Sequence, residues 1–148
     1  MDVKILRCLR ENARMNAKVI GERVQMSVSA VIERIRKLEA SGVIRRYTVV
    51  LDPKMVGKDI SAFISVSLEH PKFNDGFVEA VKRNRQVVEC HYVTGDFDYI
   101  LKVATGSTEE LTYLLGEIKS IQGVKLTKTL IVLVTSKNDV SVLPELPT

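Results

Sequence analysis

The sequence predicts an α+β protein in which a unit of three helices is followed by a β-α-β-β-α-β unit. Apolar residues recur at helical spacing in the first part of the chain and alternate with a period of two from Ser61 onward. Between the two patterns, a segment with Pro53 and Gly57 breaks regular structure. The charge divides near the same point. Residues 1–50 carry 11 Lys or Arg against 5 Asp or Glu, and residues 51–148 carry 11 against 13.

The composition excludes several classes of protein. The chain has 148 residues, of which 45% are hydrophobic and 27% are charged, and this is unlike collagen or a disordered chain. No apolar run approaches the roughly 18 residues of a membrane span, and the first residues do not resemble a signal peptide. Cys8 and Cys90 are too few and too far apart for a disulfide framework. We therefore expect a cytoplasmic protein with no membrane partner.

Three helices are predicted in the first domain, at residues 1–50. The first covers residues 2–12 with Asp2 as its N-cap, and the second begins at about Asn16. The third has its cap at Ser27 or Ser29 and extends to about residue 40. The second and third helices, joined by a short turn, form a helix-turn-helix, and we expect the domain to be winged-helix-like.

The third helix is amphipathic. With about 100° per residue, an apolar arc for the core is formed by Val28, Val31, Ile32, Ile35 and Leu38. The opposite arc carries small side chains at its N-terminal end and basic side chains further along, and this arrangement suits the major groove of DNA. Two arginines follow in the next turn, where they suit phosphate contacts. The expected DNA-binding residues are Ser27, Ser29, Ala30, Glu33, Arg34, Arg36, Lys37, Arg45 and Arg46.

The charge of the first domain supports this interpretation. Residues 1–50 have a net charge of +6 and the remaining residues a net charge of −2. A basic domain in an otherwise acidic chain is typical of nucleic-acid binding. The plain alternative is a solvated helical surface with a local excess of basic residues. The helix-turn-helix spacing favours double-stranded DNA.

The rest of the chain predicts a short strand, a hinge and a second domain. Tyr47–Leu51 is the short strand, residues 51–60 are the hinge, and residues 61–148 are the second domain. Within it, period-two and helical patterns predict strands at 61–68, 87–94, 99–105 and about 124–135, and helices at 73–84 and 107–119. A capping box of Ser107 and Glu110 begins the last helix. This order is the ferredoxin-like topology.

Two helices can cover only one face of such a sheet. The other face is expected to hold Ser61, Phe63, Ser65, Val93, Ile131 and Leu133. Because this apolar surface is too large to leave in water, we expect a homodimer that packs sheet against sheet. A two-fold dimer would also present two recognition helices to a pseudo-palindromic operator.

Few residues in the sequence suggest catalysis or the binding of a metal ion or small ligand. Gly95-Asp96-Phe97-Asp98 could hold a metal ion or the ammonium group of an amino acid, or could have only the local hydrogen bonding of a turn. Cys90 and His91 are neighbours on a strand and so face opposite sides. No phosphate-binding glycine loop, metalloprotease signature or serine-nucleophile motif is present. We therefore expect no catalytic residues, no metal site and no cofactor.

Three stretches of the chain resemble the Lrp/AsnC, or feast/famine, transcription regulators. They are Met26–Ser29 with Arg34–Ile44, then Glu89–Leu101, then Gly123–Val124 with Thr127–Thr129. The resemblance implies a second domain that dimerises, often into octamers, and binds a small effector, usually an amino acid, between dimers. It also implies that the residues near this pocket are Tyr92, Gly95, Asp96, Asp98, Thr108, Thr129, Leu130 and Val132.

The expected function is a sequence-specific DNA-binding transcription regulator and not an enzyme. One alternative is an enzyme, because sirohaem decarboxylases are similar to this family in both domains. The basic first domain and the presence of only 2 histidines argue against it. Another alternative is a non-specific, chromatin-like DNA compactor, which competition between a specific promoter and random DNA would distinguish.

Overall fold

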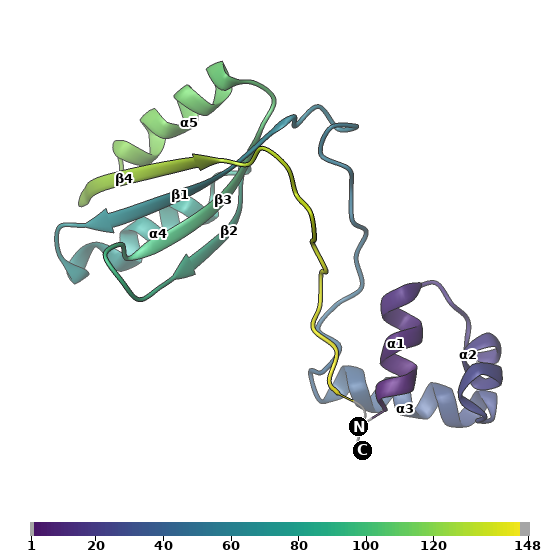
Figure 1. Ribbon diagram of the computed structural model, residues 1–148. Helices are drawn as coiled ribbons and strands as arrows, with labels where there is room; N and C mark the ends of the chain where they lie inside the picture. Colours follow the sequence, from purple (N-terminus) through teal and green to yellow (C-terminus); the bar gives the residue numbers. More distant parts are fainter. Residues whose placement is uncertain (1, 146–148) are drawn as a thin grey trace. The chain divides into compact units, whose positions relative to one another are not determined.

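The computed structural model describes residues 2–145 and divides into two compact units (Figure 1). One unit holds the chain up to Val50 together with the segment from Lys137, and the other holds Leu51–Ser136. The expected second domain extended to residue 148. The structure instead groups residues 137–145 with the helices, and residues 146–148 lie outside the described part. No helix in the described part is long and apolar enough to cross a membrane.

The helical unit contains α1 (Val3–Glu11), α2 (Ala17–Val24) and α3 (Val28–Ala40). Asn16 caps α2 by accepting the N–H of Val19 at 2.9 Å, and Ser27 caps α3 by accepting the N–H of Ala30 at 3.2 Å. The three predicted helices are therefore confirmed. Their core consists of Ile5, Cys8, Ile20, Val31 and Leu38.

Two details of the helical prediction are wrong. Asp2 makes no side-chain cap on α1, because its carboxylate accepts a hydrogen bond from Arg34 Nη1 at 3.3 Å instead. The apolar arc of α3 is narrower than expected, since Val28 is 45% exposed and Ile32 is 40% exposed. Residues four and seven positions after Val31 share its face, whereas Val28 and Ile32 lie at the flank of that face, where α1 and α2 do not cover them.

The second unit is a four-stranded antiparallel sheet with the strand order β2-β3-β1-β4. Its strands are β1 (Ile60–Leu68), β2 (Val87–Tyr92), β3 (Tyr99–Thr105) and β4 (Val124–Ile131). Its helices are the short 3-10 helix η1 (Pro71–Phe73), α4 (Asn74–Lys82) and α5 (Thr108–Lys119). The order β-α-β-β-α-β and the central position of β1 and β3 confirm the ferredoxin-like fold.

Both long helices of this unit lie on the same face of the sheet (Figure 1). The buried core combines Phe77 and Val81 of α4 with Leu111, Leu114 and Ile118 of α5, and with Ala62, Ile64, Val66, Tyr99, Leu101 and Val103 of the central strands. Ser107 caps α5 as predicted, but the carboxylate of Glu110 accepts the N–H of Gly106 and not that of the cap residue Ser107. Glu110 N–H donates to Ser107 Oγ at 3.1 Å, and Gly106 N–H donates to Glu110 Oε2 at 2.7 Å. Among the described residues of this unit, no helix packs on the second face of the sheet.

Two predicted strand segments are not strands. Tyr47–Leu51 is irregular, and β4 ends at Ile131 rather than near residue 135. The physical reason is the partner strand. β1 begins at Ile60, so the last contact of β4 is the hydrogen bond from Val132 N–H to the carbonyl of Ser61 at 2.9 Å. A strand cannot continue its ladder of backbone hydrogen bonds beyond the end of the neighbouring strand.

The open face of the sheet also differs from the expected one. Ile131 pairs with Ala62, which faces the helices, so Ile131 belongs to the covered face. Residues directly opposite each other on antiparallel strands share a face. The open face of β4 therefore consists of Leu126, Lys128 and Leu130, opposite Ser67, Ser65 and Phe63 of β1. Val93 and Leu133 lie beyond the ends of their strands.

Candidate functional site

The nine predicted DNA-binding residues occupy one side of α3 and the segment after it. Ala30 is half-buried and the other eight are exposed. Ser27 Oγ lies 3.3 Å from Ser29 Oγ, so both hydroxyls are held at the N-terminal end of the helix. The exposed residues at this end are small, and a helix with a small N-terminal end can enter the major groove closely.

The basic side chains of this surface are not equally available. Arg34 pairs with Asp2 at 3.3 Å, and Lys37 lies 4.0 Å from Glu33 one turn earlier. Within residues 2–145, Arg36, Arg45 and Arg46 form no ion pair. These three guanidinium groups can therefore bind phosphates or guanine without breaking an existing pair.

The turn before α3 sets the position of that helix. Gln25, the residue that follows α2, adopts the left-handed conformation with φ 59°, and Met26 N–H donates to the carbonyl of Gly21 at 2.9 Å. A Cβ at Gly21 would lie 2.6 Å from the oxygen of Met26. The close approach of the two segments therefore requires glycine at this position.

Sequence reasoning missed two residues of this surface. Val28 and Ile32 were expected in the core, but both are exposed on the flank of α3 next to Ser29 and Arg36. Apolar side chains at such positions can contact thymine methyl groups. The helical period places them at the edge of the apolar arc, and only the packing of α1 and α2 decides that they stay uncovered.

The Gly95–Asp98 motif, which is expected to lie near the effector, occupies the loop between β2 and β3. Gly95 has φ 108°, a conformation that favours glycine, and Asp96 is exposed. Asp98 is half-buried, and its Oδ2 accepts the N–H of Leu68 at 2.7 Å. The hydrogen bonds of Asp98 are therefore not only the local bonds of a turn, because this bond joins residues that are 30 positions apart.

A single chain does not gather the eight predicted effector residues into one pocket. Tyr92, Gly95, Asp96 and Asp98 lie at the end of the sheet where Val66 pairs with Tyr99. Thr108, Leu130 and Val132 lie toward the other end, and Thr129 lies between. The two ends are five residues of β1 apart, from Val66 to Ser61, or about 17 Å at the usual rise per strand residue.

Other candidate groups have simple environments. Cys90 pairs with Leu101 on the covered face and His91 with Ile100 on the open face, so the two side chains do not meet. Burial raises the pKa of the Cys90 thiol, an effect that the charge of Lys82 opposes. Among residues 2–145, no group of three His, Cys, Asp or Glu could hold a metal ion.

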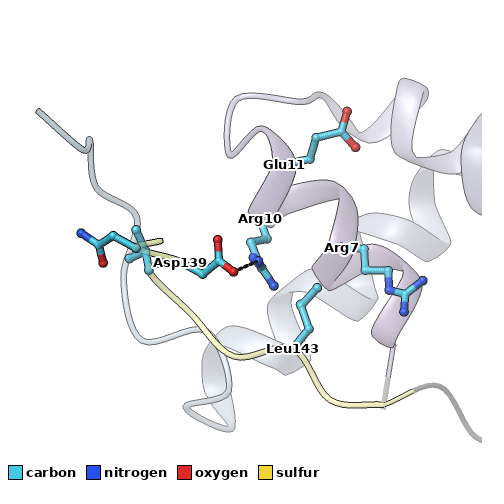
Figure 2. Close-up of a pocket in the computed structure, with 7 residues that line it drawn as sticks. Arg7, Arg10, Glu11, Asp139 and Leu143 are labelled. Carbon is cyan, nitrogen blue, oxygen red and sulfur yellow. Dashed lines mark ion pairs between the residues drawn. The ribbon is translucent and has the colours of Figure 1, made fainter. Parts of the chain in front are cut away.

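A hollow of about 500 Å³ lies in the helical unit between α1 and the segment from Lys137 (Figure 2). Arg10 and Asp139 form an ion pair of 3.6 Å across it, and Lys137 lies 3.6 Å from the same carboxylate. Leu143 is half-buried and points toward α1 (Figure 2). These contacts explain why residues 137–145 belong to the helical unit.

Comparison with known families gives two matches that follow the two units. Residues 61–142 match the Lrp/AsnC ligand binding domain. Residues 1–45 match a winged helix-turn-helix DNA-binding domain. Together the two matches cover the three helices of the first unit and all of the sheet except Ile60.

Known proteins agree with both matches. The HTH-type transcriptional regulator FL11 of Pyrococcus horikoshii is 36% identical over 137 residues, which are 93% of this chain and 90% of the relative. The transcriptional regulator NMB0573 of Neisseria meningitidis, solved with L-Met, has a TM-score of 0.91 and 31% identity over 95% of this chain and 93% of its own.

The feast or famine regulatory protein Rv3291c of M. tuberculosis, solved with L-methionine, has a TM-score of 0.89 and 31% identity over 97% of both chains. These similarities extend over both units and include the helix-turn-helix. The chain belongs to the Lrp/AsnC family and is a DNA-binding transcription regulator.

Proposed function

We propose that this regulator binds a pseudo-palindromic operator as a homodimer or a larger assembly, and that an amino acid changes its affinity for DNA. The observation that carries the proposal is the exposed side of α3, where Arg36 and the nearby Arg45 and Arg46 have no acidic partner within the described part of the chain. The remaining DNA contacts are assigned to Ser27, Ser29, Ala30, Glu33, Arg34 and Lys37.

The amino-acid effector is supported by the match to a ligand binding domain and by two similar structures that contain L-methionine. The eight effector residues lie in groups at different parts of the sheet, so we assign the pocket to two subunits. One subunit would supply the Gly95–Asp98 loop with Tyr92. Its neighbour would supply Thr108, Thr129, Leu130 and Val132. Ligand sites commonly form at such junctions.

The dimer is supported by the open face of the sheet. Phe63, Leu126 and Leu130 are 38%, 58% and 55% exposed on this face, among Lys102 and Lys128. Apolar patches of this kind mark contact surfaces, and a two-fold contact brings the same face of both subunits together.

We propose no enzymatic activity and a cytoplasmic location, where operator DNA is accessible. The named relatives are transcriptional regulators, which supports the absence of enzymatic activity. The sirohaem decarboxylase alternative has a direct test. Spectra of sirohaem incubated with the protein would change if the tetrapyrrole were decarboxylated, and we expect unchanged spectra.

The function itself is tested in two steps. A thermal-shift screen with the twenty amino acids identifies a ligand that prefers the folded chain, because such a ligand raises the apparent stability. Gel-shift titrations of the protein's own promoter, with and without that amino acid and with random DNA as competitor, then measure the effect on operator affinity. An effector must change this affinity, since its binding and DNA binding are linked.

Loss of binding to the promoter at equal concentrations of random DNA would favour the non-specific compactor. A screen in which no amino acid raises the unfolding temperature would contradict the effector part of the proposal.

A further inference from the structure

We propose that Glu33 determines part of the sequence specificity of this regulator, by accepting a hydrogen bond from the amino group of a cytosine in the major groove. The inference rests on the proposed binding of operator DNA through α3, and it names a base pair that each half of the operator contains. It concerns the one acidic residue on a side of α3 that is otherwise small or basic.

Glu33 lies in the middle of the exposed side of α3. It follows Ser29 by four positions and precedes Arg36 by three, and residues with these spacings lie on one face of a helix. All three are exposed, whereas Val31 and Leu38 on the opposite side are buried. Glu33 also belongs to the N-terminal half of the 13-residue helix, and this half of a recognition helix contacts base edges. The proposed binding of DNA through Arg36 therefore brings Glu33 to the same groove.

The carboxylate of Glu33 is largely unoccupied within the chain. Among residues 2–145 it has one polar contact, in which Lys37 Nζ lies 4.0 Å from Oε1, and both side chains are more than half exposed. An exposed ion pair of this length contributes little to stability. Glu39, the other acidic residue of α3, differs because its Oε1 accepts a hydrogen bond from the hydroxyl of Tyr47 at 2.9 Å. A contact within the chain thus accounts for Glu39, and the described part of the chain offers Glu33 only the weak pair with Lys37.

The chemistry of the major groove decides which base a carboxylate on this side of α3 can bind. The phosphates carry negative charge, and guanine and thymine present only hydrogen-bond acceptors in this groove, so all of these groups repel a carboxylate. The donors are the amino groups of cytosine and adenine, and adenine has the acceptor N7 beside its amino group. Cytosine has no acceptor on its own major-groove edge. The carboxylate of Glu33 therefore favours cytosine.

The experiment selects binding sites from a library of random DNA duplexes, using the full-length wild type, Glu33→Gln, Glu33→Ala and Glu39→Gln. Glu39→Gln is the matched control, because it removes one charge from the same helix and its amide oxygen still accepts the hydroxyl of Tyr47. Fluorescence anisotropy then measures the affinity of each protein for three kinds of DNA. They are the site that the wild type selects, the same site with each C·G pair changed in turn to T·A or A·T, and random DNA.

We expect the wild type to lose at least about fivefold in affinity when one particular C·G pair of each half-site is changed, the lower end for a single base contact. Glu33→Ala should lose the preference at that pair alone. It should also bind random DNA at least as tightly as the wild type, because a negative charge near the phosphates has been removed. Glu33→Gln should prefer adenine in place of the cytosine, since glutamine binds adenine through two hydrogen bonds.

The control and the stability of the variants separate this role from a structural one. Glu39→Gln should keep the wild-type preference at every position of the site. The unfolding temperatures of both Glu33 variants should stay within about 2 °C of the wild type, because an exposed pair four residues apart contributes little to a helix.

A wild-type site in which no change of a C·G pair matters would overturn the inference. A Glu33→Ala variant that selects the same bases with the same discrimination would also overturn it. The proposed operator binding would then stand, and Glu33 would have only its ion pair with Lys37. If the wild type selects no sequence from the library, the proposed operator binding fails, and the base contact of Glu33 fails with it.

Discussion

The hydroxyl of Tyr47 donates a hydrogen bond to Glu39 Oε1 at 2.9 Å, just beyond the C-terminal end of α3. Burial, then this hydrogen bond and the negative charge of Glu39, raise the pKa of Tyr47 from 10.0 to about 12. The neutral phenol is therefore favoured in the folded chain. Its contribution to stability is complete below pH 10 and is lost as the pH rises through about 12.

This predicts a pH-dependent difference between the wild-type chain and Tyr47→Phe. In urea unfolding below pH 10, the wild type should be more stable by no more than about 1 kcal/mol, because the side chain is half exposed. The difference should disappear between pH 10 and 12. A difference that stays constant over this range would show that the hydrogen bond to Glu39 does not exist in solution.

A second residue-scale prediction concerns the turn of the helix-turn-helix. Gly21→Ala places a Cβ 2.6 Å from the backbone oxygen of Met26, so α2 and the turn must move apart. We expect a loss of about 1–3 kcal/mol in the stability of the helical unit, the usual cost of overpacking. Denaturant unfolding followed by circular dichroism measures this loss.

Gly116→Ala is the matched control for this change. Gly116 lies within α5, and a Cβ there would have no neighbour within 4 Å. Alanine should stabilise this helix by about 0.5–1 kcal/mol, because glycine is a poor helix former. Equal effects at the two positions would contradict the proposed close approach at Gly21.

At the scale of the element, α3 combines a buried side at Val31 and Leu38 with an exposed basic side. Arg36→Ala and Lys37→Ala should each weaken operator binding and reduce the slope of log affinity against log salt by about 1, the value for one phosphate contact. Fluorescence anisotropy at several salt concentrations measures both quantities.

Lys119→Ala, at an exposed lysine of α5, is the control and should leave affinity and slope unchanged. We expect a larger loss for Arg36 than for Lys37, since Lys37 lies 4.0 Å from Glu33 and Arg36 has no acidic partner in residues 2–145. Unchanged slopes in both variants would mean that this side of α3 does not face DNA.

At the scale of the whole molecule, the open sheet face should determine assembly. Leu130→Lys places a charge on this face opposite Phe63, where a second copy would bury it. We expect a lower dimer fraction in sedimentation velocity and weaker operator binding, because unpaired charges are unfavourable in a buried contact. Tyr113→Lys, at a 75% exposed residue of α5, is the control and should stay dimeric. A dimeric Leu130→Lys would contradict sheet-to-sheet packing.

The sequence by itself determined the helices, the caps of three of them and the family. Asn16, Ser27 and Ser107 cap the helices that follow them, as the sequence predicts. These features depend on residues within about four positions of one another, so local spacing contains the information. The resemblance to the Lrp/AsnC regulators likewise depended on short stretches in a fixed order.

Only the tertiary structure decided features that depend on distant partners. Tyr47–Leu51 has strand-forming residues but no strand beside it, and Ile131 faces the helices because it pairs with Ala62. Asp98 binds Leu68, which is 30 positions away. In each of these cases a remote segment supplies the hydrogen-bond partner: the neighbouring strand for a strand and its register, and the N–H of Leu68 for the half-buried carboxylate of Asp98. The period of the apolar pattern shows which face of its own helix or strand a residue occupies. Only the packing of remote segments decides what covers that face.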